Sequence, residues 1–102
     1  MDINALMRQA QSMQRQMQKK QKEVEAKEFT VTSNGGVISV VIMGSKEIKN
    51  ITIDEDLIDV DNKDMLQEML VIAVNEAIKK VEEELSGAMS SATGGMNIPG
   101  MF

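Results

Sequence analysis

The sequence predicts an α+β fold in which one long helix precedes a three-stranded antiparallel meander and a second long helix follows it. Three observations support this order. They are an apolar pattern with helical spacing near the N-terminus, two turn motifs between short β-branched segments, and a broad apolar segment further on. The chain has 102 residues, the size of one domain. We therefore expect a single α-β-β-β-α domain over residues 1–85.

Residues 2–24 are predicted to form the first helix. Apolar side chains recur there at alternating spacings of three and four, and no Gly or Pro interrupts them. These side chains form a thin stripe, which buries too little surface to keep an isolated helix folded. We therefore expect the helix to pack against another part of the protein over at least its first half, and to pack more loosely near Lys20. We call this stripe the seam; its members are Ile3, Leu6, Ala10, Met13, Met17 and Val24.

Residues 27–53 are predicted to form the meander. Asn34 and Gly35 supply the positive φ angles of a hairpin turn, and Gly44 begins a second turn before the strand that contains Ile51. Both faces of the middle strand carry apolar side chains, so both need cover. One face has Ile38, Val40 and Ile42, and the other has Val37, Val41 and Met43.

Residues 62–85 are predicted to form the second helix, with Asp61, Asn62 or Asp64 capping its start. Its apolar surface is much wider than one stripe, and three short strands cannot hide all of it. A homodimer that shares these surfaces is the natural solution. The residues expected at the dimer interface are Val40, Ile42, Met69, Leu70, Ala73, Val74 and Ala77.

Residues 86–102 form a Gly-, Ser- and Met-rich segment without a charged side chain, and they hold 4 of the 7 glycines. We expect a flexible tail there.

The composition excludes several classes of function. The chain has no His and no Cys, which removes imidazole and thiolate from catalytic and metal-binding schemes, so we expect no enzyme, cofactor, metal site or small-molecule substrate. The longest apolar run, Met69 to Val74, is too short to span a membrane. With no disulfide and no secretory signal, a cytoplasmic location is expected.

Charge is distributed unevenly along the chain. Residues 1–50 carry 8 basic and 5 acidic side chains, whereas residues 51–102 carry 3 basic and 11 acidic ones. Arg8, Arg15 and Lys22 recur every seven residues on the first helix, with Lys19 on the same side. This stripe suits the phosphates of a duplex, although an ordinary solvated helix face has the same pattern. With only two aromatic residues, single-stranded nucleic acid is a poor fit.

An acidic segment between Asp54 and Asp64 invites a calcium interpretation, which the spacing rejects. Counting from Asp54, an EF-hand loop needs Gly at the sixth position and Glu at the twelfth, where this chain has Asp59 and Met65. A solvated loop with helix-capping residues is the better interpretation.

Several segments resemble the YbaB/EbfC family of nucleoid-associated proteins. They are residues 51–54 (Ile-Thr-Ile-Asp), residues 71–77 with their Ala-Val-Asn stretch, and the ending Gly-Gly-Met-Asn-Ile-Pro-Gly-Met-Phe. The resemblance implies a small bacterial cytoplasmic protein and a homodimer whose first helices protrude like the arms of tweezers. It also implies binding to double-stranded DNA with little sequence selectivity. On this chain the family's basic first helix falls on Arg8, Arg15, Lys19, Lys20 and Lys22.

Two other functions remain to be separated from DNA binding. A holdase-like chaperone or protein-binding adaptor would also have a helix, a meander and a helix, with Met-rich arms that grip apolar clients. An enzyme that uses the acidic segment is disfavoured because His and Cys are absent.

Overall fold

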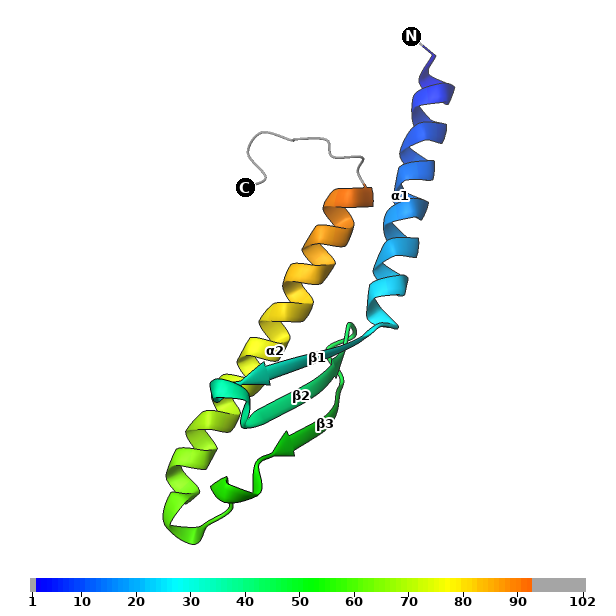
Figure 1. Ribbon diagram of the computed structural model, residues 1–102. Coiled ribbons are helices and arrows are strands. Elements are labelled where there is room, and N and C mark those ends of the chain that lie inside the picture. The colour runs from blue at the N-terminus through cyan, green and yellow to red at the C-terminus, as the bar shows by residue number, and fades with distance from the viewer. Residues whose placement is uncertain (1, 93–102) are drawn as a thin grey trace.

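The computed structural model describes residues 2–92, so residues 1 and 93–102 lie outside its described part. It confirms the predicted order of elements (Figure 1). The elements are helix α1 (Ile3–Glu25), strands β1 (Glu28–Ser33), β2 (Ile38–Met43) and β3 (Ile48–Ile53), and helix α2 (Lys63–Ala92).

The molecule is long and thin because both helices extend beyond the sheet in the same direction (Figure 1). Its extents are 70 × 27 × 16 Å, and its radius of gyration is 19.4 Å. A compact chain of this length would have a radius of gyration of about 13 Å. A large part of the helical surface is therefore left outside the protomer's own core.

Helix α1 begins where the sequence predicts, but it packs at the opposite end from the one expected. Asp2 caps the helix by accepting a hydrogen bond from the backbone N–H of Asn4 at 3.1 Å. Val24 is buried and Met17 half-buried, whereas every residue from 2 to 11 is exposed. The expectation of packing over the first half is wrong because only the C-terminal half of α1 lies beside α2.

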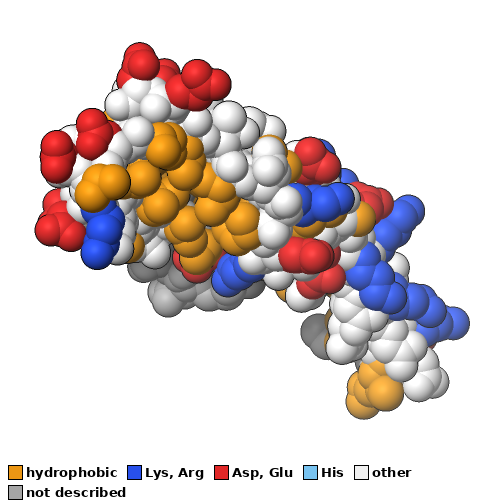
Figure 2. Space-filling view, turned by 90° about the horizontal axis from the view of Figure 1, so that it is seen from below, with side chains coloured by type: hydrophobic (Ala, Val, Ile, Leu, Met, Phe, Trp, Pro, Cys, Tyr) orange, Lys and Arg blue, Asp and Glu red, His pale blue; other side chains and the backbone are white. Residues whose placement is uncertain are grey.

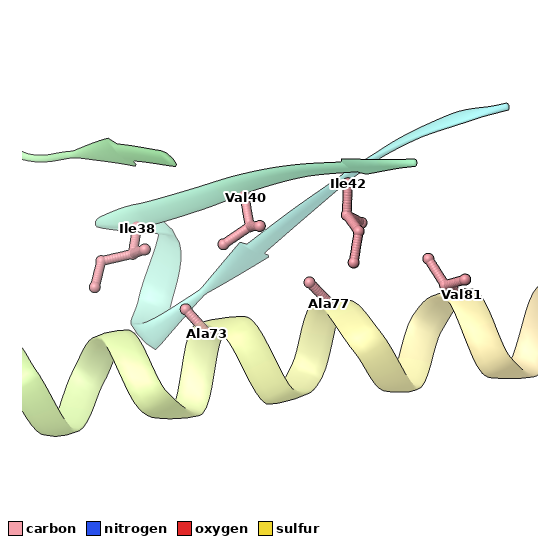
Figure 3. Close-up of a cluster of buried hydrophobic side chains, with 6 residues drawn as sticks. All are labelled: Ile38, Val40, Ile42, Ala73, Ala77 and Val81. Carbon is pink, nitrogen blue, oxygen red and sulfur yellow. The ribbon is translucent and has the colours of Figure 1, made fainter. Parts of the chain in front are cut away.

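The sheet is antiparallel in the order β1-β2-β3. The first turn has positive φ at Asn34, Gly35 and Gly36, as the sequence predicts. The alternation on β2 is also confirmed, because one set of side chains is fully buried against α2 and the other is half-buried on the far face. The buried cluster comprises Ile38, Val40, Ile42, Ala73, Ala77 and Val81 (Figure 3).

Helix α2 covers β1 and β2 but leaves β3 largely uncovered. Ile51 pairs with Val40 and therefore points to the same side of the sheet, yet Ile51 is exposed while Val40 is buried. In the turn between β1 and β2, the side-chain amide of Asn34 donates a hydrogen bond to the backbone carbonyl of Met69 at 3.0 Å. This bond fixes the turn against α2. The inner face of β3 thus remains available to another molecule.

Helix α2 starts and ends later than the sequence predicts. A 3-10 helix (Val60–Asn62), capped by Asp59, leads directly into it, and Asp64 lies in its first turn. Its last turns include residues 86–92, which corrects the prediction that these residues are flexible; residues 93–102 of the predicted tail lie outside the described part. Gly87 costs a helix about 1 kcal/mol, whereas Ala88 is half-buried and lines the groove between the two helices with Val24 of α1.

Gly44 allows the β2–β3 turn to touch the end of α1. Its N–H donates to the carbonyl of Lys27 at 2.9 Å, and a Cβ at this position would overlap the carbonyl of Val24. A close approach of two backbones is a use for which glycine is suited. This contact sets the angle at which α1 leaves the sheet.

We expect Gly44→Ala to destabilise the protein by about 1–3 kcal/mol, because the methyl group forces the turn away from α1. A loss of unfolding free energy of this size lowers the Tm of a domain of this length by about 4 °C or more, which calorimetry would measure. Gly87→Ala is the matched control, since open space surrounds that position and alanine favours a helix. An unchanged Tm for Gly44→Ala would contradict the close approach.

Candidate nucleic-acid interface

Three of the predicted DNA-binding side chains surround one shallow hollow on α1. Arg15, Lys19 and Lys22 line it together with Gln18, Glu23 and Ala26. Arg8 lies two turns earlier on the same helical face, because a seven-residue spacing nearly completes two turns. We call Arg8, Arg15, Lys19 and Lys22 the basic stripe; all four residues are exposed.

The side chains of the basic stripe have no acidic partner among the described residues. Within residues 2–92 the ion pairs are Lys20–Glu23, Lys46–Glu82 and Lys80–Glu84, and none of them includes a member of the stripe. From Arg8 to Lys22 the stripe extends about 21 Å along the helix axis. One strand of a duplex carries a phosphate about every 3.4 Å along its axis, so this length spans several of them.

Lys20 lies on a different side of α1 from Arg8, Arg15 and Lys22, although it shares one hollow with Lys19. It is exposed, but it lines the groove between α1 and α2 with Glu83 and Glu84, and its ammonium lies 3.8 Å from the carboxylate of Glu23. Residues two apart on a helix point to different sides. Lys20 therefore lies on the seam side of α1, next to Lys19 but away from Arg8, Arg15 and Lys22.

The acidic segment between Asp54 and Asp64 lies in the loop between β3 and α2, at the end of the molecule remote from the free end of α1 (Figure 1). Asp54 and Asp59 each accept a hydrogen bond of 2.9 Å from a backbone N–H two residues later, which confirms capping as a role for this segment. In the described part of the chain no group of three or more acidic side chains is arranged to hold a metal ion. This acidic segment is thus distant from Arg8 and Arg15, whereas Glu23 lies beside the C-terminal part of the basic stripe.

Four residues predicted at a dimer interface belong instead to the protomer's own core. Val40, Ile42, Ala73 and Ala77 have no exposed surface, so they cannot contact a second chain. The prediction failed because it did not establish which side of the second helix the sheet would cover. Met69, Leu70 and Val74 are half-buried and keep some free surface.

The sequence analysis missed a second group of apolar residues that the structure exposes. Val71 is 60% exposed and Ile72 is 47% exposed, and both precede the buried Ala73. At 100° per residue, Val71 lies about 160° from Ala73 and Ile72 about 100° from it in the opposite direction, so neither side chain points at the sheet. The helical period gives their angle to Ala73, but only the position of the sheet shows that they are the exposed ones. Figure 2 shows hydrophobic side chains gathered in one patch on the face it presents, with acidic side chains at its border.

Neither α1 nor α2, over the residues described, has the length and hydropathy needed to cross a bilayer.

Comparison with known proteins gives a consistent result. A nucleoid-associated protein of Clostridium novyi is 49% identical over 102 residues, covering 100% of this chain and 90% of the relative. One from Clostridium acetobutylicum is 50% identical over 100 residues, covering 98% and 89%. The crystal structure of an uncharacterized protein from Helicobacter pylori superposes with a TM-score of 0.67 at 28% identity, covering 85% of this chain and 91% of that one. The sequence model of the YbaB/EbfC DNA-binding family matches residues 1–96, and the chain belongs to this family.

Proposed function

We propose that this protein is a bacterial nucleoid-associated protein that binds double-stranded DNA as a homodimer, through the basic stripes of two α1 helices. It acts in the cytoplasm, on the nucleoid, and affects chromosome organisation and gene expression. The observation that carries the proposal is the unpaired, exposed basic stripe on a helix that projects from the body of the molecule.

The composition of the stripe supports binding with little sequence selectivity. Long cationic side chains on an exposed helix contact phosphates, which carry no sequence information directly. Of the two aromatic residues, Phe29 is half-buried and packs against the core, and the ammonium of Lys27 lies 5.9 Å from its ring centre. Phe29 is therefore not placed to stack on unpaired bases.

The exposed side of α2 supports the homodimer. The run Met69 to Val74 is apolar on all sides of the helix, but the sheet covers only the side of Ala73. A helix that is apolar all round is normally buried. A second copy of this chain would supply the same apolar surface in return, as symmetric dimers do. It would also bring a second basic stripe, and two linked weak sites bind far more tightly than one.

The salt dependence of DNA binding tests the proposal. Binding to random-sequence duplex DNA is expected to weaken steeply with salt, and each neutralised phosphate contributes about 0.9 to the slope of log K against log salt. Arg8→Gln with Arg15→Gln should lower this slope by about 2 to 4 per dimer. Lys49→Gln with Lys63→Gln removes the same charge from exposed positions off the stripe and should leave the slope unchanged. Equal slopes for both variants would reject the stripe as the binding surface.

A DNA-binding assay and an aggregation assay on the same purified protein distinguish DNA binding from the chaperone alternative. A protein that does not bind DNA at low salt but prevents aggregation of an unfolded client would act as a holdase, and the proposal would then be wrong.

A further inference from the structure

The seam on α1 is covered along only part of its length. Near the sheet Val24 is buried, and Met17 and Met13 are half-buried where α1 lies beside α2. The same stripe continues past the end of α2, where Ile3 is 71% exposed and Leu6 is 46% exposed (Figure 1). An apolar stripe that continues from a buried contact into solvent is a surface that another apolar segment can cover.

We propose that residues 93–102 of the same chain bind the exposed part of the seam, at Ile3, Leu6 and Ala10. The direction of α2 supports this occupant. Helix α2 runs antiparallel to α1, and Ser91 lines a hollow with Gln16 and Lys20 of α1. The chain therefore leaves α2 beside the middle of α1.

The length of the chain beyond Ala92 is sufficient. Ile3 lies 13 residues before Gln16, which is about 20 Å along the helix axis. Ten residues span up to about 33 Å when extended. The segment can reach the free end of α1 without moving either helix, and it has slack to lie against the side chains there.

The chemistry of the segment matches the surface. Residues 93–102 contain no charged side chain, and four of them are large and apolar, namely Met96, Ile98, Met101 and Phe102. The basic stripe lies on the other side of α1, so a segment bound to the seam leaves the cations free. Tethering also raises the effective concentration of this segment to the millimolar range, above that of a separate molecule.

Binding of the segment would protect the free end of α1. Residues 2–11 are exposed and have no neighbour on α2, and such a helix end frays readily. Arg8 belongs to this part of the helix, so covering the seam stabilises the part of α1 that presents the outermost cation of the basic stripe.

A spin label tests the proposal directly, because the chain has no cysteine and Asn97→Cys creates a single labelling site. In the full-length protein, a nitroxide at position 97 should broaden the amide signals of residues 3–10. A mixture of isotope-labelled chains without nitroxide and unlabelled chains with it, refolded together, should show no such broadening. Broadening in the mixture would mean that a second copy supplies the segment. Either that result or the absence of broadening in the first sample overturns the proposal.

Two variants provide matched controls. Leu6→Gln removes a seam side chain and should abolish the broadening, whereas Ala5→Gln changes the adjacent exposed residue, which lies off the seam, and should preserve it. Amide exchange gives a second readout, since Ile98→Asp should speed exchange at residues 3–10 by on the order of tenfold. Unchanged exchange in Ile98→Asp would also count against the proposal. DNA binding enters neither measurement, so the outcome is independent of the proposed function.

Discussion

Replacing all four residues of the basic stripe by Glu is expected to abolish binding to duplex DNA. The variant Arg8→Glu, Arg15→Glu, Lys19→Glu, Lys22→Glu removes four phosphate contacts per α1 and puts carboxylates in their place. Affinity should fall by at least about a thousandfold at low salt, because non-specific binding depends almost entirely on such contacts. An electrophoretic mobility shift or fluorescence anisotropy titration with random-sequence DNA would measure the loss.

The control must have the same net charge, since repulsion between an acidic protein and DNA would also weaken binding. Changing Lys46, Lys49, Lys63 and Lys79 to Glu lowers the formal charge by the same amount from −5, at exposed positions off the stripe. Losing the ion pair of Lys46 with Glu82 has a small effect, because both side chains are exposed. Equal loss of affinity in the two variants would show that net charge, rather than the stripe, controls binding.

A second large effect is expected from Val71→Asp combined with Ile72→Asp. Both side chains are exposed in the protomer, so the fold should persist. In the proposed dimer they would be buried, and burying an unpaired carboxylate costs several kcal/mol or more. The protein should sediment as a single 11.3 kDa chain rather than at twice that mass. Its affinity for DNA should fall by about a hundredfold, because one basic stripe then acts without the other.

Ser45→Asp with Ser86→Asp adds the same charge at exposed positions outside the run Met69 to Val74 and should leave the dimer intact. Dissociation of this control would mean that added charge alone separates the chains. A wild-type protein that sediments as a single chain would remove the dimer from the proposed function.

Local features could be predicted from the sequence because local physics determines them. The positive φ at Asn34 and Gly35 follows from the turn that these residue types prefer. The burial of Ile38, Val40 and Ile42 on one side of β2 follows from the alternation of a strand. The shared face of Arg8, Arg15 and Lys22 follows from the helical period.

Features that depend on how elements pack could not be predicted as well. The apolar surface of α2 is wide, so its sequence does not show whether Ala73 or Val71 faces the sheet; the sheet's position settles this. The predicted end of α2 at residue 85 neglected the packing of Ala88 beside Val24 of α1. Lys20 was grouped with the basic stripe by composition, although its position on the seam side separates it.

The position of the acidic segment at one end of the 70 Å axis has a consequence for a crowded duplex. At physiological ionic strength a charge is screened beyond about 8 Å, so phosphates in contact with Arg8 and Arg15 would not sense the carboxylates between Asp54 and Asp64. A molecule held by its α1 helices turns its acidic end outward. In the proposed complex, coated DNA would present an anionic exterior that repels further copies, and we expect the coat to limit itself to a single layer.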